Sequence, residues 1–548
     1  MSERVRQIKD PIYGYIYLPD DYVQGVVDTP EFQRLRKISQ TSYEALYPSA
    51  THNRFAHSLG VFHLGSIVAQ AIQENSIDAF GLNDEQKGKY LDYLEVYRLA
   101  CLLHDVGHAP FSHTSERFYI GKTGRRLLHE AIATLTGDGR FVAEAKNAAP
   151  HELMSAVVAL KHFDALIGNN QHKSFFARAI TGYEYAVKGE LKSNEEGVSY
   201  AYLNALISLL NSKVVDVDRL DYLIRDAFQT GYESINIDYE RLLKAVRIKK
   251  HDGSYELVFS KDALSVLENA VYAHDAEKKW IQTHLTICYD TYLLENAISK
   301  LLVCDELSSV ELFGEKGIST EGVEIPLYSD QAVGRNYRIR LMSDGDVLFL
   351  LKNNESDFSL EYFDRRKRKH PLWKTEHEYK SHFKEEGWTE FFKSVAKYDG
   401  VSAPGRIDSV ALERCRRNVV DCEQACKGAS SQEQEKCSDQ LALARKMLKR
   451  LEMFKSFADE VHVAFDFVLL QRKPFESGFN KKEFSSLKIE VRGTERVMRF
   501  CDATDVLSCG AGNEKPISDE TYYLFMQKPA DPAIPVIEKF KSMFRDLI

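Results

Sequence analysis

Apolar residues recur at helical spacing through most of the first 305 residues. Val96, Leu99, Ala100 and Leu103, for example, follow a period of about 3.6 residues and share one helix face. Strand signals are few in this part of the chain. The spacing predicts helices at 56–75, 91–104, 151–166, 200–230 and 261–302.

The pattern changes after residue 305. Short β-branched runs at 323–327 and 337–340 predict strands, and residues 347–370 return to helical spacing. A stretch rich in Glu, Lys, Arg, Ala and Leu predicts a helical hairpin over 406–455, and strand-like runs follow at 461–470 and 486–491. The chain is therefore predicted to be mainly α, with a helical core and a smaller α+β C-terminal lobe. Its predicted segments are 1–305, 306–405, 406–456 and 457–548.

Composition narrows the class of protein. The chain has 548 residues, 44% of them hydrophobic, and a net charge of −9, which argues against a general nucleic-acid binder. The basic run 365–370 is interpreted as a solvated face, with phosphate contact as the alternative. We find neither a run of about 18 apolar residues nor the apolar core of a secretion signal, so we expect no membrane contact and a cytoplasmic location.

Nine cysteines are sparse for this length and are typical of a reducing compartment. Cys415, Cys422, Cys426 and Cys437 fall on the predicted hairpin, with Cys422 and Cys437 equidistant from its turn and thus able to face each other. Ordinary thiols are favoured over a structural zinc site, because four-thiolate zinc sites use short paired spacings. A disulfide is the remaining alternative.

The most distinctive motif is His-Asp-Val-Gly-His-Ala-Pro-Phe-Ser-His at 104–113. Gly107 and Pro110 end the preceding apolar helix, so His104 and Asp105 lie at a rigid helix end. Burying an imidazole and a carboxylate without partners is costly. A metal ion would provide a partner for both.

Two other motifs supply further ligands. His57 lies near the start of one predicted helix, and Asp218 lies among acids in another. Two imidazoles and two carboxylates suit Mn²⁺, Fe²⁺, Zn²⁺ or Ni²⁺, with Mg²⁺ also considered, and such an ion lowers the pKa of bound water to about 7. The alternative is a set of separately satisfied polar groups at helix ends.

Asp218 also begins a stripe with Tyr222 and Asp226, at i, i+4 and i+8 of one helix. If Asp218 faces the metal, Tyr222 and Asp226 line a cleft in which Asp226 can accept a hydrogen bond from a sugar hydroxyl. Arg54 and Arg219 are candidates to hold phosphate oxygens.

These residues resemble the HD-domain phosphohydrolases, whose H…HD…D arrangement is matched by His57, His104, Asp105 and Asp218. The resemblance is closest to the deoxynucleoside triphosphate triphosphohydrolases, which include the sterile-alpha-motif/HD-domain enzyme and bacterial dGTPase-like proteins. It covers residues 8–305 and implies an HD-domain helical core, without an expected sterile-alpha-motif domain before it. The matching stretches are 28–36, 52–60, 104–113, 151–152 and 216–226.

The resemblance implies a role for each matching residue. His108 and Glu116, where the family usually has aspartate, would form the acid/base pair, and the reaction would release a deoxynucleoside and triphosphate. Other contacts are implied with the phosphates or bridging oxygen (His113, His151), the triphosphate (Arg54, Arg219, Tyr222) and the sugar 3′-hydroxyl (Gln40, Asp226).

A regulatory site is implied as well. Asp28, Gln33, Arg36 and Arg247 resemble residues that bind an activating guanine nucleotide, such as GTP, or a dNTP. Alternatively, Asp28 caps a helix and Arg36 only forms ion pairs. Activation would act through a homo-oligomer, which we expect to be a dimer, tetramer or hexamer.

Three hypotheses follow. The first is a metal-dependent dNTP triphosphohydrolase, for housekeeping or antiviral defence. The second is a phosphohydrolase of another nucleotide or nucleic-acid end, because the stripe that grips phosphate and sugar in the animal enzyme is replaced here by Ala273, Glu277 and Ile281, or by His274, Lys278 and Gln282. The third is a nucleotide-responsive scaffold without the chemistry, which has no need of metal ligands.

Overall fold

The contacts of the computed structural model divide the chain into two units, residues 1–356 with 477–513, and residues 357–476 with 514–548. The four segments predicted from the sequence are a finer division and stay a prediction. The structure describes residues 4–120, 124–144, 148–187, 192–212, 215–232, 235–251, 254–304, 309–326, 336–400, 403–428, 434–472, 475, 477–478, 487–491, 497–504 and 520–548.

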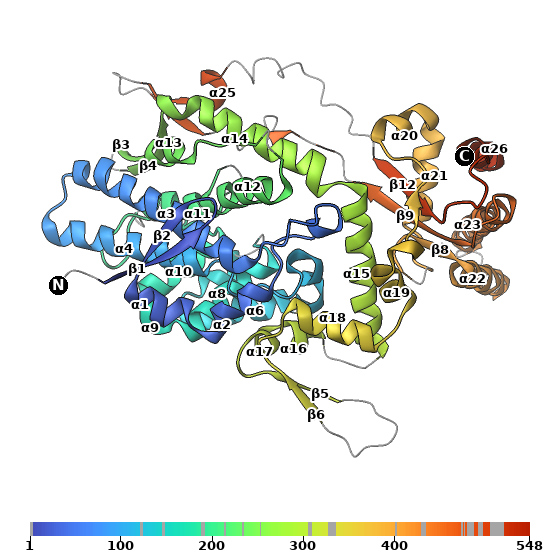
Figure 1. Ribbon diagram of the computed structural model, residues 1–548, viewed down its shortest axis with the longest axis horizontal. Coiled ribbons are helices and arrows are strands. Elements are labelled where there is room, and N and C mark those ends of the chain that lie inside the picture. The colour runs from blue at the N-terminus through green and yellow to red at the C-terminus, as the bar shows by residue number, and fades with distance from the viewer. Residues whose placement is uncertain are drawn as a thin grey trace. The chain divides into compact units, whose positions relative to one another are not determined.

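The first unit is a helical core (Figure 1). At its centre α3 (Arg54–Asn75) packs against α4 (Asp84–Leu103) and α12 (Val217–Thr230). Around α4 pack α10 (Asn170–Thr181) and α11 (Tyr200–Leu210), and α8 (Pro150–His162) packs on α10. Because α3 is buried on most sides, it holds its polar residues in the interior.

Shorter elements surround this core. A second group of helices consists of α14 (Leu264–Ala276), the π-helical turn η7 (Glu277–Gln282), α15 (Leu285–Cys304) and α18 (Asp344–Asn353). The remaining α-helices are α1 (Asp20–Tyr22), α2 (Pro30–Gln33), α5 (Glu116–Ile120), α6 (Gly124–Thr136), α7 (Arg140–Glu144), α9 (Asp164–Ile167), α13 (Tyr239–Lys244), α16 (Ser309–Phe313), α17 (Glu315–Ile318) and α25 (Phe500–Ala503).

The first unit also carries small sheets. The antiparallel pair β1 (Val5–Asp10) and β2 (Gly14–Pro19) opens the chain, and β5 (Val323–Pro326) pairs with β6 (Asn336–Ile339). A four-stranded sheet has the order β11-β10-β4-β3, in which β10 runs parallel to β4. Its strands are β3 (Val246–His251), β4 (Ser254–Ser260), β10 (Lys488–Glu490) and β11 (Val497–Arg499).

The second unit is built on a four-stranded antiparallel sheet of order β7-β12-β9-β8. Its central strand β12 is buried along its whole length, and an aromatic core that includes Trp373, Phe392 and Phe540 covers it. The strands are β7 (His370–Pro371), β8 (Arg406–Asp408), β9 (Asp466–Arg472) and β12 (Thr521–Met526). The helices are α19 (Asp357–Phe363), α20 (Glu376–His382), α21 (Glu386–Ala396), α22 (Ser409–Gly428), α23 (Gln434–Glu460) and α26 (Val536–Phe544).

The predicted fold class is confirmed, but four of the predicted helices are wrong as single elements. Residues 151–166 divide into α8 and α9, because the backbone leaves the helix at Phe163. Residues 200–230 divide into α11 and α12, because Asp216 leaves the helix and its side chain accepts a hydrogen bond from the backbone of Arg219. Residues 261–302 are interrupted by η7, and residues 347–370 hold the end of α18, then α19, a 3-10 turn and β7. The strands β1 to β4 were not predicted.

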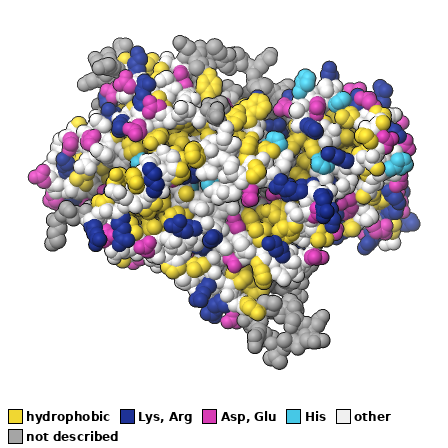
Figure 2. Space-filling view, viewed as in Figure 1, with side chains coloured by type: hydrophobic (Ala, Val, Ile, Leu, Met, Phe, Trp, Pro, Cys, Tyr) yellow, Lys and Arg dark blue, Asp and Glu magenta, His cyan; other side chains and the backbone are white. Residues whose placement is uncertain are grey.

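Residues Arg54–Phe80 are long and apolar enough to span a membrane, and 72% of their apolar window is buried in the fold, as in an interior helix. In the view of Figure 2, basic side chains are interspersed with acidic ones. Lys369 of the basic run is buried and paired with Glu361 and Asp466. The hairpin cysteines are free thiols, and Cys437 lies within hydrogen-bonding reach of Cys426.

Gly107 holds the His-Asp turn close to α8. Its backbone N–H donates to Ser155 Oγ at 3.0 Å, and a Cβ atom at this position would collide with the backbone of Met154 and Ser155. We expect Gly107→Ala to lower the free energy of unfolding by about 3 kcal/mol, because neither backbone can move without repacking. Denaturant unfolding measures this. Gly88→Ala on the partly exposed surface of α4, where a Cβ meets nothing, is the control and should not destabilise the protein.

Candidate metal centre and substrate pocket

His104 lies directly after α4, as its C-cap residue. Its Nδ1 is hydrogen-bonded to the Cys101 carbonyl at 2.9 Å, which fixes the ring and turns Nε2 toward α3 and α12. His57 projects from the first turns of α3, and Asp218 from the first turn of α12. Three elements distant in sequence thus bring their side chains to one point.

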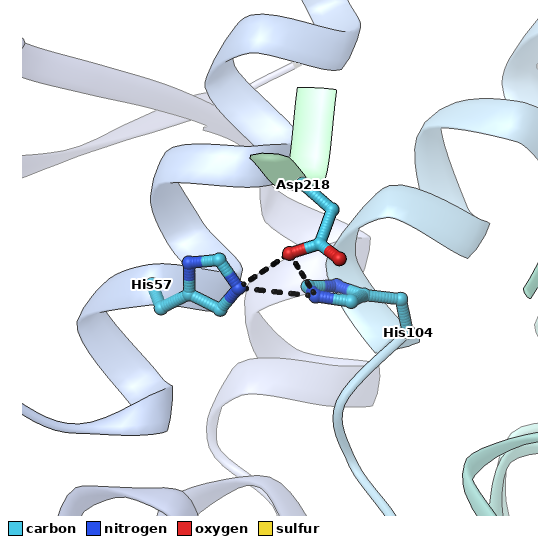
Figure 3. Close-up of side chains that lie close together, drawn as sticks. All are labelled: His57, His104 and Asp218. Carbon is cyan, nitrogen blue, oxygen red and sulfur yellow. Dashed lines mark hydrogen bonds and ion pairs between the residues drawn. The ribbon is translucent and has the colours of Figure 1, made fainter. Parts of the chain in front are cut away.

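Three of the four predicted ligands, His57, His104 and Asp218, converge at this point (Figure 3). His57 Nε2 lies 3.0 Å from Asp218 Oδ1 and 3.3 Å from His104 Nε2, and His104 Nε2 lies 3.6 Å from Asp218 Oδ1. Asp105 Oδ2 lies 3.5 Å from both imidazole Nε2 atoms. The four residues predicted as a metal site from the sequence are therefore neighbours.

This arrangement fits a divalent metal ion. Metal–ligand bonds of about 2.1 Å at right angles place adjacent ligand atoms about 3 Å apart, close to the spacing found here. The ligand atoms of His57, His104 and Asp218 all lie within 4.8 Å of one another. Burial disfavours a charged Asp218, but hydrogen bonds to His104 and His57 hold its pKa well below its usual range, so it is ready to bind a cation.

A buried ion network supports His57 from behind. His57 Nδ1 is hydrogen-bonded to Asp221 Oδ2 at 2.7 Å, and Arg225 holds the same carboxylate through two bonds of 2.9 and 3.0 Å. Arg225 also bonds Asp10 at 3.0 Å. Burial opposes a charged His57, but its hydrogen bonds to Asp218 and Asp221 raise its pKa to about 9. Carboxylate–histidine pairs of this kind orient metal ligands.

Arg54 is predicted to hold a phosphate, and in the structure it is already engaged. Its Nη1 donates to Asp105 Oδ2 at 2.7 Å, its Nε to Ser112 Oγ at 2.9 Å, and its Nη2 to the Gln40 carbonyl at 3.3 Å. Arg54 therefore fixes the carboxylate of Asp105 beside the other three candidate ligands. Burial favours the neutral acid, but the Arg54 charge keeps the pKa of Asp105 well below its usual range.

A second cluster of titratable groups adjoins the first. Glu116 Oε1 is hydrogen-bonded to His151 Nδ1 at 2.6 Å and to His113 Nδ1 at 2.7 Å. The acid/base pair that the resemblance implies, His108 and Glu116, stays a prediction. In the structure His108 stacks on His151 at 4.3 Å between ring centroids, and its Nε2 lies 3.3 Å from Asp105 Oδ1. Glu116 lies one short helical turn beyond His113, which brings it to that ring.

The environments of this cluster push its pKa values apart. Burial, followed by the Arg54 charge, lowers the pKa of His108 well below its usual range. Burial alone would do the same to His151, but its hydrogen bond to Glu116 raises the pKa instead. The pKa values of the two stacked imidazoles are thus shifted in opposite directions, a pattern typical of acid–base sites.

A pocket of about 460 Å³ opens beside the metal cluster. Two residues of the predicted stripe, Tyr222 and Asp226, line this pocket together with Gln40, Arg54 and His113. Arg219 lies on the first turn of α12, where its Nη2 donates to the Ser212 carbonyl at 3.2 Å.

The predicted regulatory residues lie on the surface of the first unit. Asp28 and Arg36 are exposed, Gln33 and Arg247 are partly exposed, and Arg36 packs on the Phe55 ring while its Nε donates to Gln33. Arg247 donates to the backbone carbonyls of Lys244 and Val246. The cap position of α2 is Thr29, not Asp28. Nucleotide binding by these residues stays a prediction.

Three residues of the site were given no role by the sequence. Asp221 supports His57, His52 bonds Asp226, and Glu277 lines the pocket. A signal was present for Asp221, which is a further acid on the buried face of α12, and for His52, which belongs to the motif that contains His57. Glu277 lies on a π-helical turn, whose register the sequence pattern does not reveal.

Comparison with protein families identifies the core. Residues 54–223 match the family model described as HD domain, a range that starts at α3, ends within α12 and contains all four candidate ligands. A phosphohydrolase structure from Bacteroides thetaiotaomicron superimposes with a TM-score of 0.52 at 20% identity, over 96% of this chain and 100% of that one. That likeness shows a shared fold.

Curated relatives are distant. An uncharacterized protein of Methanocaldococcus jannaschii is 25% identical over 66% of this chain and 61% of its own length. The deoxynucleoside triphosphate triphosphohydrolase SAMHD1 of Homo sapiens is 30% identical over 46% of this chain and 38% of its own length. The SAMHD1 homolog of Dictyostelium discoideum is 29% identical over 50% and 46%. The chain thus spans between 38% and 61% of the length of these relatives.

Proposed function

We propose that this chain, whose residues 54–223 form an HD domain, is a metal-dependent phosphohydrolase that cleaves deoxynucleoside triphosphates to deoxynucleoside and triphosphate. The convergence of His57, His104, Asp105 and Asp218 beside an open pocket is the observation that carries the proposal. The relatives named as deoxynucleoside triphosphate triphosphohydrolases support the choice of substrate.

The four ligands would hold a divalent ion. When bound, that ion supplies a Lewis acid for a phosphoryl oxygen and makes hydroxide available near neutral pH. Asp105 is fixed by Arg54 and Asp218 by the two imidazoles, so the ligands are preorganised. Little rearrangement is then needed when an ion arrives.

The second cluster, formed by Glu116 and the three imidazoles, would act as the general acid and base. His151, charged through its bond to Glu116, holds a proton on the ring edge and can give it to the departing sugar oxygen. His108 is neutral and stacked against it, so the two rings divide the acid and base roles. His113 shares the Glu116 carboxylate and orients it toward His151.

The remaining roles are part of the same proposal. Arg219 and Tyr222 would contact the phosphates, and Gln40 and Asp226 the sugar. Asp28, Gln33, Arg36 and Arg247 would bind a GTP or dNTP activator in a cytoplasmic homo-oligomer. A phosphohydrolase of another phosphoester is the second candidate, favoured by the carboxylate of Glu277 in the pocket.

Product analysis tests the proposal. Purified protein is incubated with Mn²⁺ and each of the four dNTPs, with and without GTP, and products are separated by anion exchange. We expect inorganic triphosphate and deoxynucleoside in equal amounts. Release of orthophosphate or pyrophosphate would contradict the assigned bond, and absence of turnover with metal bound would favour another phosphoester. Dependence on GTP would support the regulatory site, with Arg36→Ala expected to abolish it.

A further inference from the structure

The pocket beside the metal cluster contains polar atoms that the structure leaves without partners. Gln40 Oε1, Thr41 Oγ1 and Glu277 Oε2 are all buried, all three residues line the pocket, and none of these atoms has a hydrogen-bond partner. An unsatisfied buried polar atom costs about 1–3 kcal/mol, so several in one pocket indicate a ligand that supplies the missing partners.

Glu277 is held in one orientation. It is 1% exposed and begins the π-helical turn η7. Its Oε1 accepts hydrogen bonds from Tyr43 Oη at 3.2 Å and Gln282 Nε2 at 2.8 Å. Because both donors use the same oxygen, Oε2 has no donor apart from a proton shared with Asp226, and its other lone pair is open to whatever occupies the pocket.

Asp226 faces Glu277 within hydrogen-bonding reach. Burial raises the pKa of Asp226 to about 7, and burial together with the Asp226 charge raises that of Glu277 well above its usual range. Asp226 Oδ1 is bonded to His52 Nε2 at 2.7 Å, and burial lowers the pKa of His52 to about 3, so that ring is neutral. The two carboxyl groups therefore share a proton and offer both a donor and acceptors.

This chemistry restricts the ligand. An anionic phosphate would be repelled by the carboxyl pair, whose direct partners His52, Tyr43 and Gln282 are neutral. The cation that also lines the pocket, Arg54, is already paired with Asp105. A neutral group with two neighbouring hydroxyls matches the site, because each hydroxyl donates to a carboxyl oxygen and accepts the shared proton or a bond from Thr41. Acidic side chains recognise ribose hydroxyls in this way elsewhere.

We propose that Glu277 and Asp226 together bind the 2′- and 3′-hydroxyls of a ribose, so that the substrate class includes ribonucleoside triphosphates. The inference rests on the proposed function and widens it beyond 2′-deoxynucleotides. A deoxyribose has one hydroxyl for this pair and leaves Glu277 Oε2 without a donor. The loss of one hydrogen bond to a charged or proton-sharing group corresponds to about a tenfold preference for ribose.

The test compares kcat/KM for GTP with dGTP, and for ATP with dATP, in the native chain and two variants. Glu277→Gln keeps the oxygen that Tyr43 and Gln282 bond but replaces the free acceptor with an amide NH₂, and Glu277→Met removes both. We expect the ribo-to-deoxy ratio to fall about tenfold in each, mainly through the ribonucleotide. Glu240→Gln, an exposed carboxylate on α13 paired with Lys244, is the matched control and should leave the ratio unchanged.

Binding separates this inference from the proposed reaction. Calorimetry with α,β-methylene GTP and its 2′-deoxy counterpart reports sugar preference even if no nucleotide is hydrolysed. A ribose preference that disappears in both Glu277 variants supports the inference. Equal affinity for the two analogues in the native chain, a ratio unaffected by Glu277→Gln in a folded protein, or no binding of either analogue would overturn it.

Discussion

A protein carrying His104→Ala and Asp105→Ala should purify without a bound divalent ion and lose hydrolytic activity by about a thousandfold or more. These residues supply an imidazole and a carboxylate to the converging cluster, and Asp105 also anchors Arg54. Without them, His57 and Asp218 are left as two ligands, too few to hold the ion at micromolar concentration. Elemental analysis of the purified protein and steady-state rates in added Mn²⁺ measure the two losses.

The control for this double variant is His377→Ala, an exposed histidine of the second unit that is flanked by glutamates. It should retain metal and activity. Because His104 and Asp105 are buried, the double variant is also checked by circular dichroism and thermal melting. A folded double variant that still turns over nucleotide would rule out the metal centre as the reacting site. A folded double variant that loses hydrolysis but keeps nucleotide binding would show that the native chain is an enzyme rather than a nucleotide-binding scaffold.

The ligand set could be predicted because each member is marked by local sequence. Gly107 and Pro110 fix the end of α4 at His104, and the acids of α12 stand out in an apolar helix. Predicting that these four residues form one site required only the assumption that buried polar side chains share a partner. Contacts between distant segments could not be predicted in this way. Glu116 bonds His151 because a 3-10 turn precedes Glu116 and because α8 packs nearby, and no spacing along the chain encodes that contact.

The missed elements have similar causes. In β2 the buried residues Ile16 and Leu18 alternate with Tyr15 and Tyr17, which are exposed but equally apolar, so the period of two is hidden. The helices over 200–230 and 261–302 were merged because their hydrophobic spacing continues across each break. The first break depends on Asp216 capping α12, and the second on the π-helical register of η7.

Asp221→Asn should weaken the binding of Mn²⁺ by about 10- to 100-fold while leaving all four ligands in place. Asp221 accepts a hydrogen bond from His57 Nδ1 and thereby presents Nε2 to the metal. The asparagine amide can either accept a hydrogen bond from His57 Nδ1 or donate one to it, so the tautomer and the basicity of His57 are no longer fixed. Close packing reinforces the contact, since a Cβ atom at Gly60 would overlap the Asp221 carboxylate.

A matched variant separates this effect from general destabilisation. Asp221→Asn also weakens the ion pair with buried Arg225, and we expect it to lower the free energy of unfolding by about 2–3 kcal/mol. Asp10→Asn removes the other carboxylate partner of Arg225 without touching His57, so it should destabilise comparably yet keep Mn²⁺ affinity within about threefold. Calorimetric titration of Mn²⁺ into the three proteins decides the matter. If both variants lose Mn²⁺ affinity equally, the network stabilises the fold rather than orienting His57. If only Asp221→Asn loses affinity, the Asp221 carboxylate orients His57 as a metal ligand.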